Sequence, residues 1–218
     1  MPQIFRARSN TTFRVLLVLL LALLAGAGWL AYAIVWSPYV TRVGVPMPQP
    51  VAFSHEHHAG VLGIDCRYCH ESVERAAFAG MPSTHTCMTC HSQLFIDQEM
   101  LQPIRSSLAE NRPVRWTRVH DLPDFTYFHH GIHVQKGIGC STCHGRVDKM
   151  PLTFQTETLY MKWCLDCHRD PARFIRPANE IFNMAWTPDE KWIKSLREKV
   201  ESNPVGPAPL TECQVCHR

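Results

Sequence analysis

The chain has 218 residues, enough for one ordinary domain or two small ones, and its 22 basic and 19 acidic side chains leave a formal net charge of +3. This formal charge by itself says little about a nucleic-acid partner, and nothing else in the chain indicates one. Apolar residues make up 45% of the chain. They are unevenly distributed, with the longest apolar run near the N-terminus.

Residues 15–36 carry no charge and are long enough to cross the core of a bilayer as a helix. The segment is preceded by Arg6, Arg8 and Arg14, and aromatic side chains gather towards its far end at Trp29, Tyr32 and Trp36. The positive-inside rule therefore predicts a cytoplasmic N-terminus (1–14) and a single-pass anchor, with the rest of the chain on the other side of the membrane. The alternative is a cleaved signal peptide, because small-x-small sites occur at 25–27 and 31–33. The apolar run is longer than a signal peptide requires and continues past both sites, which favours the anchor.

Residues 37–52 contain four prolines and show no helical period. Proline removes a backbone donor and fixes φ, so this composition predicts an extended tether between the anchor and the following domain. The domain is expected to comprise residues 53–218.

All ten cysteines lie in five Cys-x-x-Cys-His motifs. The cysteine pairs are Cys66 and Cys69, Cys87 and Cys90, Cys140 and Cys143, Cys164 and Cys167, and Cys213 and Cys216; the histidines are His70, His91, His144, His168 and His217. In this motif two thiols bond to the haem vinyl groups and the histidine ligates the iron. A zinc or disulfide framework would leave the five histidines unexplained. The sequence therefore predicts five c-type haems, and covalent attachment of this kind belongs in an extracytoplasmic compartment.

An internal repeat organises four of the motifs. The pattern Phe-x-His-x-x-His begins at Phe53 and again at Phe128, and each copy continues to a Cys-x-x-Cys-His motif, a Met-Pro pair and a second motif. Residues 53–91 and 128–168 are thus predicted to be two copies of a two-haem unit, with the fifth motif separate at 213–217.

Two helices are predicted outside the motifs. Residues 92–115 contain a moderately amphipathic stretch, with Leu94, Leu101, Ile104 and Leu108 near one face. Thr187 and Pro188 are predicted to cap and begin a second helix, whose apolar face carries Ile193, Leu196 and Val200. No strand pattern stands out. The expected fold class is mainly α and irregular: one N-terminal transmembrane helix and a multihaem cytochrome c domain with little sheet.

Eight histidines lie outside the motifs and are candidates for the sixth ligand of each iron. The repeat aligns His55 with His130 and His58 with His133, whereas His57 faces an isoleucine and His129 a serine in the other copy. His120 is preferred to His85, which lies too close to its own motif to reach across the ring. The predicted distal ligands are His55, His58, His120, His130 and His133, with Met161 as a less favoured candidate.

If most haem irons have an axial protein ligand on both faces, the chain transfers single electrons and needs no catalytic site of its own. The sequence contains no lysine variant of the haem motif, no free catalytic thiol and no phosphate-binding loop. No catalytic residues are therefore predicted.

The peptides FSHEHHAGVLGIDCRYCH, MPSTHTCMTCH, WTRVHDLPDFTYFHHGIH and LYMKWCLDCHRDP resemble the membrane-anchored pentahaem cytochrome c subunit of bacterial alternative complex III, a quinol:electron acceptor oxidoreductase. The Phe-x-His-x-x-His element is also similar to the small multihaem cytochromes c3 and c7.

The resemblance implies a location in the bacterial inner membrane, with the haem domain on the periplasmic side. It also implies a quinol-binding membrane subunit and an iron–sulfur protein as electron donors, and a monohaem cytochrome c or a terminal acceptor as the next carrier. The same five distal histidines match the family pattern. A stand-alone membrane-anchored quinol dehydrogenase and a multihaem reductase with an open iron are the competing hypotheses.

Overall fold

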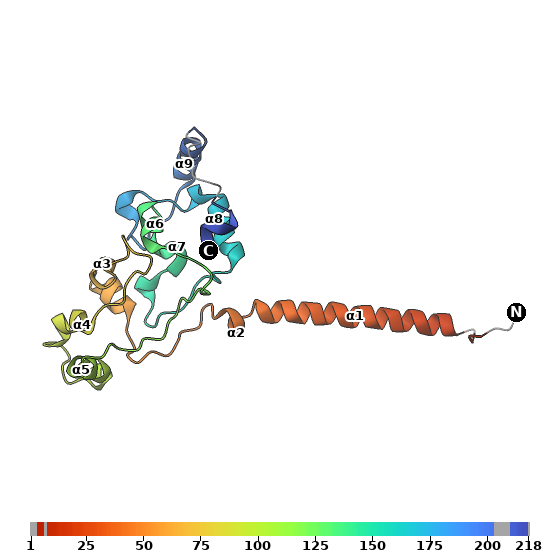
Figure 1. Ribbon diagram of the computed structural model, residues 1–218, viewed down its shortest axis with the longest axis horizontal. Helices are drawn as coiled ribbons and strands as arrows, with labels where there is room; N and C mark the ends of the chain where they lie inside the picture. Colours follow the sequence, from red (N-terminus) through yellow and green to blue (C-terminus); the bar gives the residue numbers. More distant parts are fainter. Residues whose placement is uncertain (1–3, 7, 203–209, 218) are drawn as a thin grey trace. The chain divides into compact units, whose positions relative to one another are not determined.

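The computed structural model describes residues 4–6, 8–202 and 210–217 (Figure 1). The chain divides into two compact units, Met1–Arg42 and Val43–Arg218. Each unit is held together by its own contacts, so they are described in turn.

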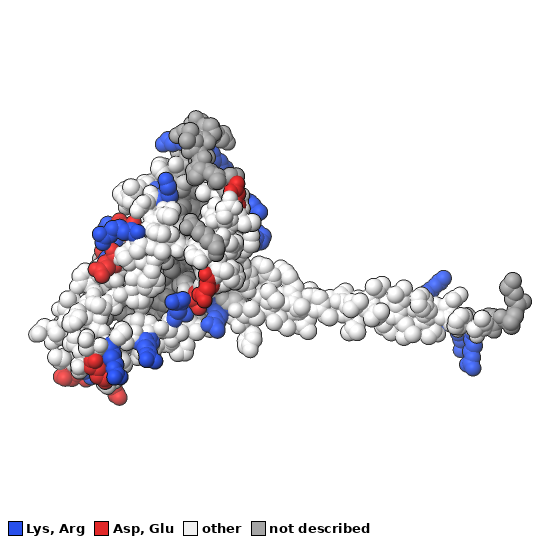
Figure 2. Space-filling view, viewed as in Figure 1, with Lys and Arg blue, Asp and Glu red and all other residues white. Residues whose placement is uncertain are grey.

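The first unit consists of α1(Ser9–Val35) and α2(Pro38–Thr41). By length and composition α1 could cross a membrane: its 27 residues span about 40 Å, more than the ~30 Å of a hydrocarbon core. Figure 2 shows no charged side chain along most of this helix, with basic side chains near its N-terminal end. The helix begins six residues before the predicted segment, and the Thr12 hydroxyl there donates to the carbonyl of Arg8.

The sequence predicted an extended tether, but the tether is not extended throughout. Helix α2 forms one helical turn within it. Ser37 has the extended conformation of an N-cap and Pro38 supplies a helical φ at the first position. The turn ends at Arg42, whose φ of 57° is left-handed.

In the second unit, residues 43–51 lie along the haem domain. Val43 forms a parallel bridge with Gln155, and the Gly44 amide donates to the Gln155 carbonyl over 2.8 Å. The Gln49 amide group bonds both backbone groups of Thr117, at 2.8 and 2.9 Å. Side-chain and backbone bonds to distant residues therefore fix this part of the tether to the domain.

The domain is built from short helices joined by irregular segments. In chain order these are η1(Glu56–Val61), α3(Cys66–Cys69), α4(Thr84–His91), η2(Glu99–Leu101), α5(Gln102–Ala109), α6(His130–Gln135), α7(Cys140–His144), η3(Val147–Lys149), α8(Met161–Arg169), η4(Pro171–Arg173), η5(Ala178–Glu180), α9(Glu190–Ser202) and α10(Cys213–Cys216). The described residues form isolated bridges but no sheet. The predicted fold class is confirmed.

The protein core is small. Val73, Val134 and Ile181 form a buried cluster, and no large side chain among the described residues is fully buried. A domain of this size normally needs a larger apolar core to be stable. Bound macrocycles would supply the missing apolar surface.

Both predicted helices form, with different boundaries. Within 92–115 the helical residues are η2 and α5; Leu94 lies outside them and Phe95 has a left-handed φ of 58°. Helix α9 begins at Glu190 rather than at Pro188, because Asp189 is the capping residue and accepts a 2.6 Å bond from the Trp192 amide. The side chain of Val200 lies outside the described residues.

Candidate haem-binding sites

Each Cys-x-x-Cys pair lies within a short helix, so the two thiols of a pair are separated by about one turn and project from the same side. All ten cysteines have free thiols. The first two motifs are held by helix caps: Asp65 accepts a bond from the Arg67 amide, and Ser83 accepts one from the Thr86 amide. Each pair is therefore presented with both sulfurs available for a thioether bond.

The histidines of four motifs are oriented through their Nδ1 atoms. These atoms bond backbone carbonyl oxygens, which leaves Nε2 of each ring available to bind a metal. The pairs are His70 with Gly80 (2.7 Å), His91 with Leu94 (3.1 Å), His168 with Leu210 (2.8 Å) and His217 with Phe125 (3.1 Å). The fifth, His144, is deeply buried, and burial lowers its pKa to about 3. A neutral imidazole is the form that ligates iron.

The two Phe-x-His-x-x-His segments make the same contacts. Phe53 stacks on the ring of His58 at 4.4 Å between centroids and meets His55 edge-on at 4.8 Å. In the second copy Phe128 stacks on His133 at 4.5 Å and meets His130 at 4.7 Å. The spacing of the pattern thus places one aromatic ring between two histidines, and it does so identically in both copies.

Three histidines that were not predicted as ligands, His57, His85 and His129, differ in their surroundings. His129 caps α6, because its Nδ1 accepts a bond from the Ile132 amide at 3.2 Å. Its counterpart Ser54 does the same through its hydroxyl, which accepts a 3.1 Å bond from the His57 amide. His57 and His85 are exposed. A serine can replace His129 because capping requires only an acceptor.

Three pairs of imidazoles face one another at a common separation. An iron bonded to two imidazole nitrogens at about 2 Å each requires ring centroids roughly 6 Å apart. The observed centroid separations are 6.1 Å for His58 and His91, 6.2 Å for His133 and His168, and 6.3 Å for His130 and His144. The residues present therefore fit a haem with a histidine on each face.

The first and third motifs lie against each other. The thiols of Cys66 and Cys140 are hydrogen-bonded, which raises the pKa of Cys140. The segments also cross: His55 Nδ1 bonds the Thr153 hydroxyl at 2.9 Å, and His130 Nδ1 bonds the Ala77 carbonyl at 2.7 Å. His55 and His130 are thus each anchored on the loop that follows the other copy's first motif.

His120 lies beside the third motif. Its ring is 4.3 Å from that of His144, which is shorter than the separation that an intervening iron needs. Its Nε2 is buried without a hydrogen-bond partner, and burial lowers the pKa of the ring to about 4. The ring is therefore neutral and has a free nitrogen, although it does not face His144 across an iron-sized gap.

The fifth motif packs against the fourth and against residues 125–127. The Tyr127 amide donates to the Cys216 carbonyl at 2.8 Å, and the ring of Phe125 lies 5.8 Å from that of His217. Within the described part of the chain, the ring contacts of His217 include no second histidine. Cys216 is close enough to Cys164 to raise its pKa, burial being the larger cause. Met161, one turn before Cys164, is 59% exposed.

Two comparisons with known proteins agree with this geometry. The model of the class III cytochrome c family matches residues 38–121, which include the first two motifs and His120. The multihaem cytochrome c subunit of menaquinone reductase from Nitratidesulfovibrio vulgaris (strain Hildenborough) is 30% identical over 141 residues, which are 55% of this chain and 67% of that protein. The chain belongs to the class III multihaem cytochrome c family. This class III cytochrome c accordingly carries covalently bound c-type haem.

The class III cytochrome c is also similar to the cytochrome subunit of acrylate reductase from Shewanella woodyi. The identity is 24% over 114 residues, which are 52% of this chain and 70% of that protein. Both relatives are cytochrome subunits of reductases by name.

Two side chains near the motifs were not predicted from the sequence. Thr153 belongs to the pattern Met-Pro-x-Thr, which also occurs at 81–84, so extending the repeat beyond the Met-Pro pair would have indicated it. Arg176 belongs to no motif. It is buried beside α7, a contact that only the tertiary structure brings about.

Proposed function

We propose that this class III cytochrome c is the electron-transfer subunit of a membrane quinol:electron acceptor oxidoreductase of the alternative complex III type. The observation that carries the proposal is the separation of about 6 Å between histidine rings beside three of the motifs. When bound, c-type haem supplies reversible one-electron chemistry between ferric and ferrous iron. Five such groups, one on each motif, would carry electrons along the domain.

The proposed ligands follow from the ring pairs and the repeat. His58 and His133 face the histidines of the second and fourth motifs. His55 and His130 occupy equivalent places in the two copies, so we assign them to the irons of the first and third motifs. His130 supports this directly because it faces His144 at 6.3 Å.

For the iron of the fifth motif, no histidine ring in the described part of the chain lies opposite His217 to act as the sixth ligand. His120 was the sequence-based choice for the remaining position, but it is enclosed beside His144. Met161 is on α8, the helix that also carries Cys164 next to the fifth motif. We therefore propose Met161 for this position, which would give that haem a higher potential than bis-histidine ligation.

The protein's role at each iron is to fill both axial positions and to hold the ligands still. Backbone carbonyls orient the imidazoles, and aromatic rings pack against the distal pairs. A closed coordination sphere leaves no position for substrate and requires little rearrangement on electron transfer. This arrangement supports an electron carrier rather than a reductase with an open iron.

The contacts also suggest an order of the five sites. The segment 55–58 joins the second motif to the first, the two thiols Cys66 and Cys140 join the first to the third, and 130–133 joins the third to the fourth. The fifth motif lies beside the fourth. We propose that electrons pass along the order second, first, third, fourth and fifth, in either direction.

The proposed setting is the bacterial inner membrane, with α1 as anchor and the haem domain on the periplasmic side. Proposed partners are a quinol-binding membrane subunit, an iron–sulfur protein and a monohaem cytochrome c. The relative that is named as a menaquinone reductase subunit supports a quinone-linked complex.

The test is purification of the full chain in mild detergent, alone and from its native membrane. We expect five haems per chain by haem assay, low-spin ferric signals by electron paramagnetic resonance, and no quinol oxidation by the isolated chain. Peptide mass spectrometry should find haem on each of the five motifs. Rapid quinol oxidation by the isolated chain would instead indicate a stand-alone quinol dehydrogenase, and predominantly high-spin signals would indicate an open iron.

A further inference from the structure

The third motif has a buried cation beside it. Arg176 is 7% exposed, and its guanidinium donates to the hydroxyls of Ser141 (2.6 Å) and Thr142 (3.3 Å), the two inner residues of the motif. It also donates to the Asn183 carbonyl at 2.8 Å and lies over the ring of Trp186 at 5.2 Å. These contacts hold the charge against α7.

This cation has no anionic partner in the described part of the chain. The ion pairs found there do not include Arg176, and its Nε is buried without a hydrogen-bond partner. The carboxylate that influences its pKa, Glu180, accepts hydrogen bonds from the side chains of Asn179 and Asn183 instead. Burial lowers the pKa of Arg176, but a guanidinium stays protonated in proteins. A full positive charge therefore lies in a poorly solvated place.

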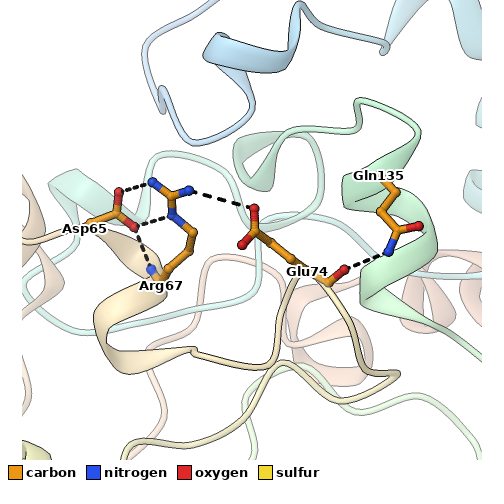
Figure 3. A network of polar contacts seen from close by, with 4 residues as sticks. All are labelled: Asp65, Arg67, Glu74 and Gln135. Atoms are coloured by element: carbon orange, nitrogen blue, oxygen red, sulfur yellow. Dashed lines mark hydrogen bonds and ion pairs between the residues drawn. The ribbon is translucent and has the colours of Figure 1, made fainter.

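The first motif has the opposite electrostatic environment. Its inner arginine, Arg67, is paired with Asp65 at 2.8 Å and with Glu74 at 3.8 Å, as Figure 3 shows. All three side chains are about half exposed, at 47 to 48%. Two carboxylates therefore more than balance the cation, and solvent screens what remains.

The repeat shows where the difference arises in the sequence. The residue before the first cysteine is Asp65 in the first copy and Gly139 in the second. A Cβ at Gly139 would overlap the guanidinium of Arg176. Gly139 thus does two things: it removes the carboxylate that the first copy has, and it leaves the space that the buried cation fills.

A nearby positive charge stabilises the reduced form of an iron centre, because reduction lowers the positive charge of the centre by one. The effect is larger where the cation is buried than where it is solvated and paired. The proposed distal histidines of the first and third motifs, His55 and His130, occupy equivalent places in the repeat. The third motif differs from the first in this buried charge and in the neutral ring of His120 beside His144.

We propose that Arg176 raises the midpoint potential of the haem on the third motif above that of the haem on the first motif. An electron shared between the haems of the first and third motifs would then reside mainly on the third-motif haem, which is the one nearer to the fourth and fifth motifs. The inference rests on the proposed haem attachment at the third motif, and it assigns Arg176 a positioning and charge-tuning role rather than a catalytic one.

The test is potentiometric titration of the full chain in detergent, followed by visible and electron paramagnetic resonance spectra. Arg176→Gln should lower one midpoint potential, whereas Arg176→Lys, which keeps the charge, should retain most of the original value. The matched control is Arg67→Gln, whose exposed and paired cation should give a clearly smaller shift in a different component.

A further variant tests the proposal without removing the buried arginine, in case Arg176→Gln does not fold. Thr142→Asp places a carboxylate beside the guanidinium at a position where the fourth motif already carries Asp166. It should lower the same midpoint potential while Arg176 stays in place.

The proposal is overturned if Thr142→Asp leaves every midpoint potential unchanged, or if Arg176→Lys and Arg176→Gln shift the same component equally. Absence of haem from the peptide of residues 140–144 in the unmodified chain would contradict the proposed function instead, so the two failures can be told apart.

Discussion

The imidazoles around the motifs differ in the hydrogen bond that their Nδ1 atom makes. His58 and His133 bond the carbonyls of residues four positions earlier through Nδ1, at 2.8 Å in both copies, which leaves Nε2 available to bind a metal. His129 uses Nδ1 as an acceptor for a backbone amide. The hydrogen bond of one nitrogen therefore distinguishes the proposed ligand His133 from the helix cap His129, although both are histidines in one short segment.

We expect His58→Ala and His133→Ala each to convert one low-spin haem to a high-spin or ligand-exchanging form. The reason is that each variant removes the imidazole that lies about 6 Å from the histidine of the second or the fourth motif. Electron paramagnetic resonance of the purified chain measures the change. His57→Ala is the control and should leave all haem bands unchanged, since its side chain is exposed; a shifted spectrum there would contradict the alignment of the two copies.

Met161 gives a second prediction at this scale. If it ligates the iron of the fifth motif, Met161→His should lower one midpoint potential, because a histidine ligand stabilises ferric iron relative to methionine. Redox titration with visible spectroscopy would show the shift, together with loss of the methionine–iron charge-transfer band. An unchanged titration would mean that another residue, with His120 the remaining candidate, fills that position.

Among the elements, α9 shows how a cap decides where a helix begins. Thr187 and Pro188 predict a start two residues earlier, but the Asp189 carboxylate accepts a hydrogen bond from the Trp192 amide and sets the first turn. The indole of Trp192 then donates to the Ile175 carbonyl at 2.9 Å, next to Arg176. The helix therefore supports the segment that holds the buried cation.

Replacing this cap should cost stability. Asp189→Ala leaves the first amides of α9 without an acceptor, so we expect a loss of about 1 kcal/mol in the free energy of unfolding. Thermal denaturation followed by circular dichroism would measure it. Thr187→Ala is the matched control, and equal destabilisation by both variants would show that the cap is shared.

The parts of the structure that were predictable from the sequence are those set by local spacing. The five motifs, the two cysteines on one side of a turn and the equivalence of His55 with His130 all follow from positions a few residues apart or from the repeat. The contact between the first and third motifs does not, because it depends on packing between residues about 75 positions apart. Arg176 was missed for the same reason: only the folded chain brings it to Ser141 and Thr142.

At the scale of the whole molecule, the chain combines a long apolar helix with a domain that has little protein core. We expect deletion of residues 4–36, with a cleavable export signal in their place, to move the protein from the membrane fraction to the soluble fraction without loss of haem. The reason is that unit Val43–Arg218 has its own internal contacts, including those of the tether at Gln49. Fractionation and a haem assay test this.

N-terminal sequencing of the native protein is the companion measurement. An intact N-terminus before residue 15 supports the anchor. A mature chain that begins near residue 28 or 34 would instead support the signal peptide that the small-x-small sites allow.

The crossing of the two copies has a consequence for how the protein is made. His55 is anchored by Thr153, and His130 by the carbonyl of Ala77, so neither half contains all the hydrogen-bond partners of its own repeat histidine. If the domain is exported as proposed, the N-terminal half emerges first, and His55 has no Thr153 partner until the chain beyond residue 153 has followed. A product truncated between the copies would leave both histidines without these hydrogen bonds.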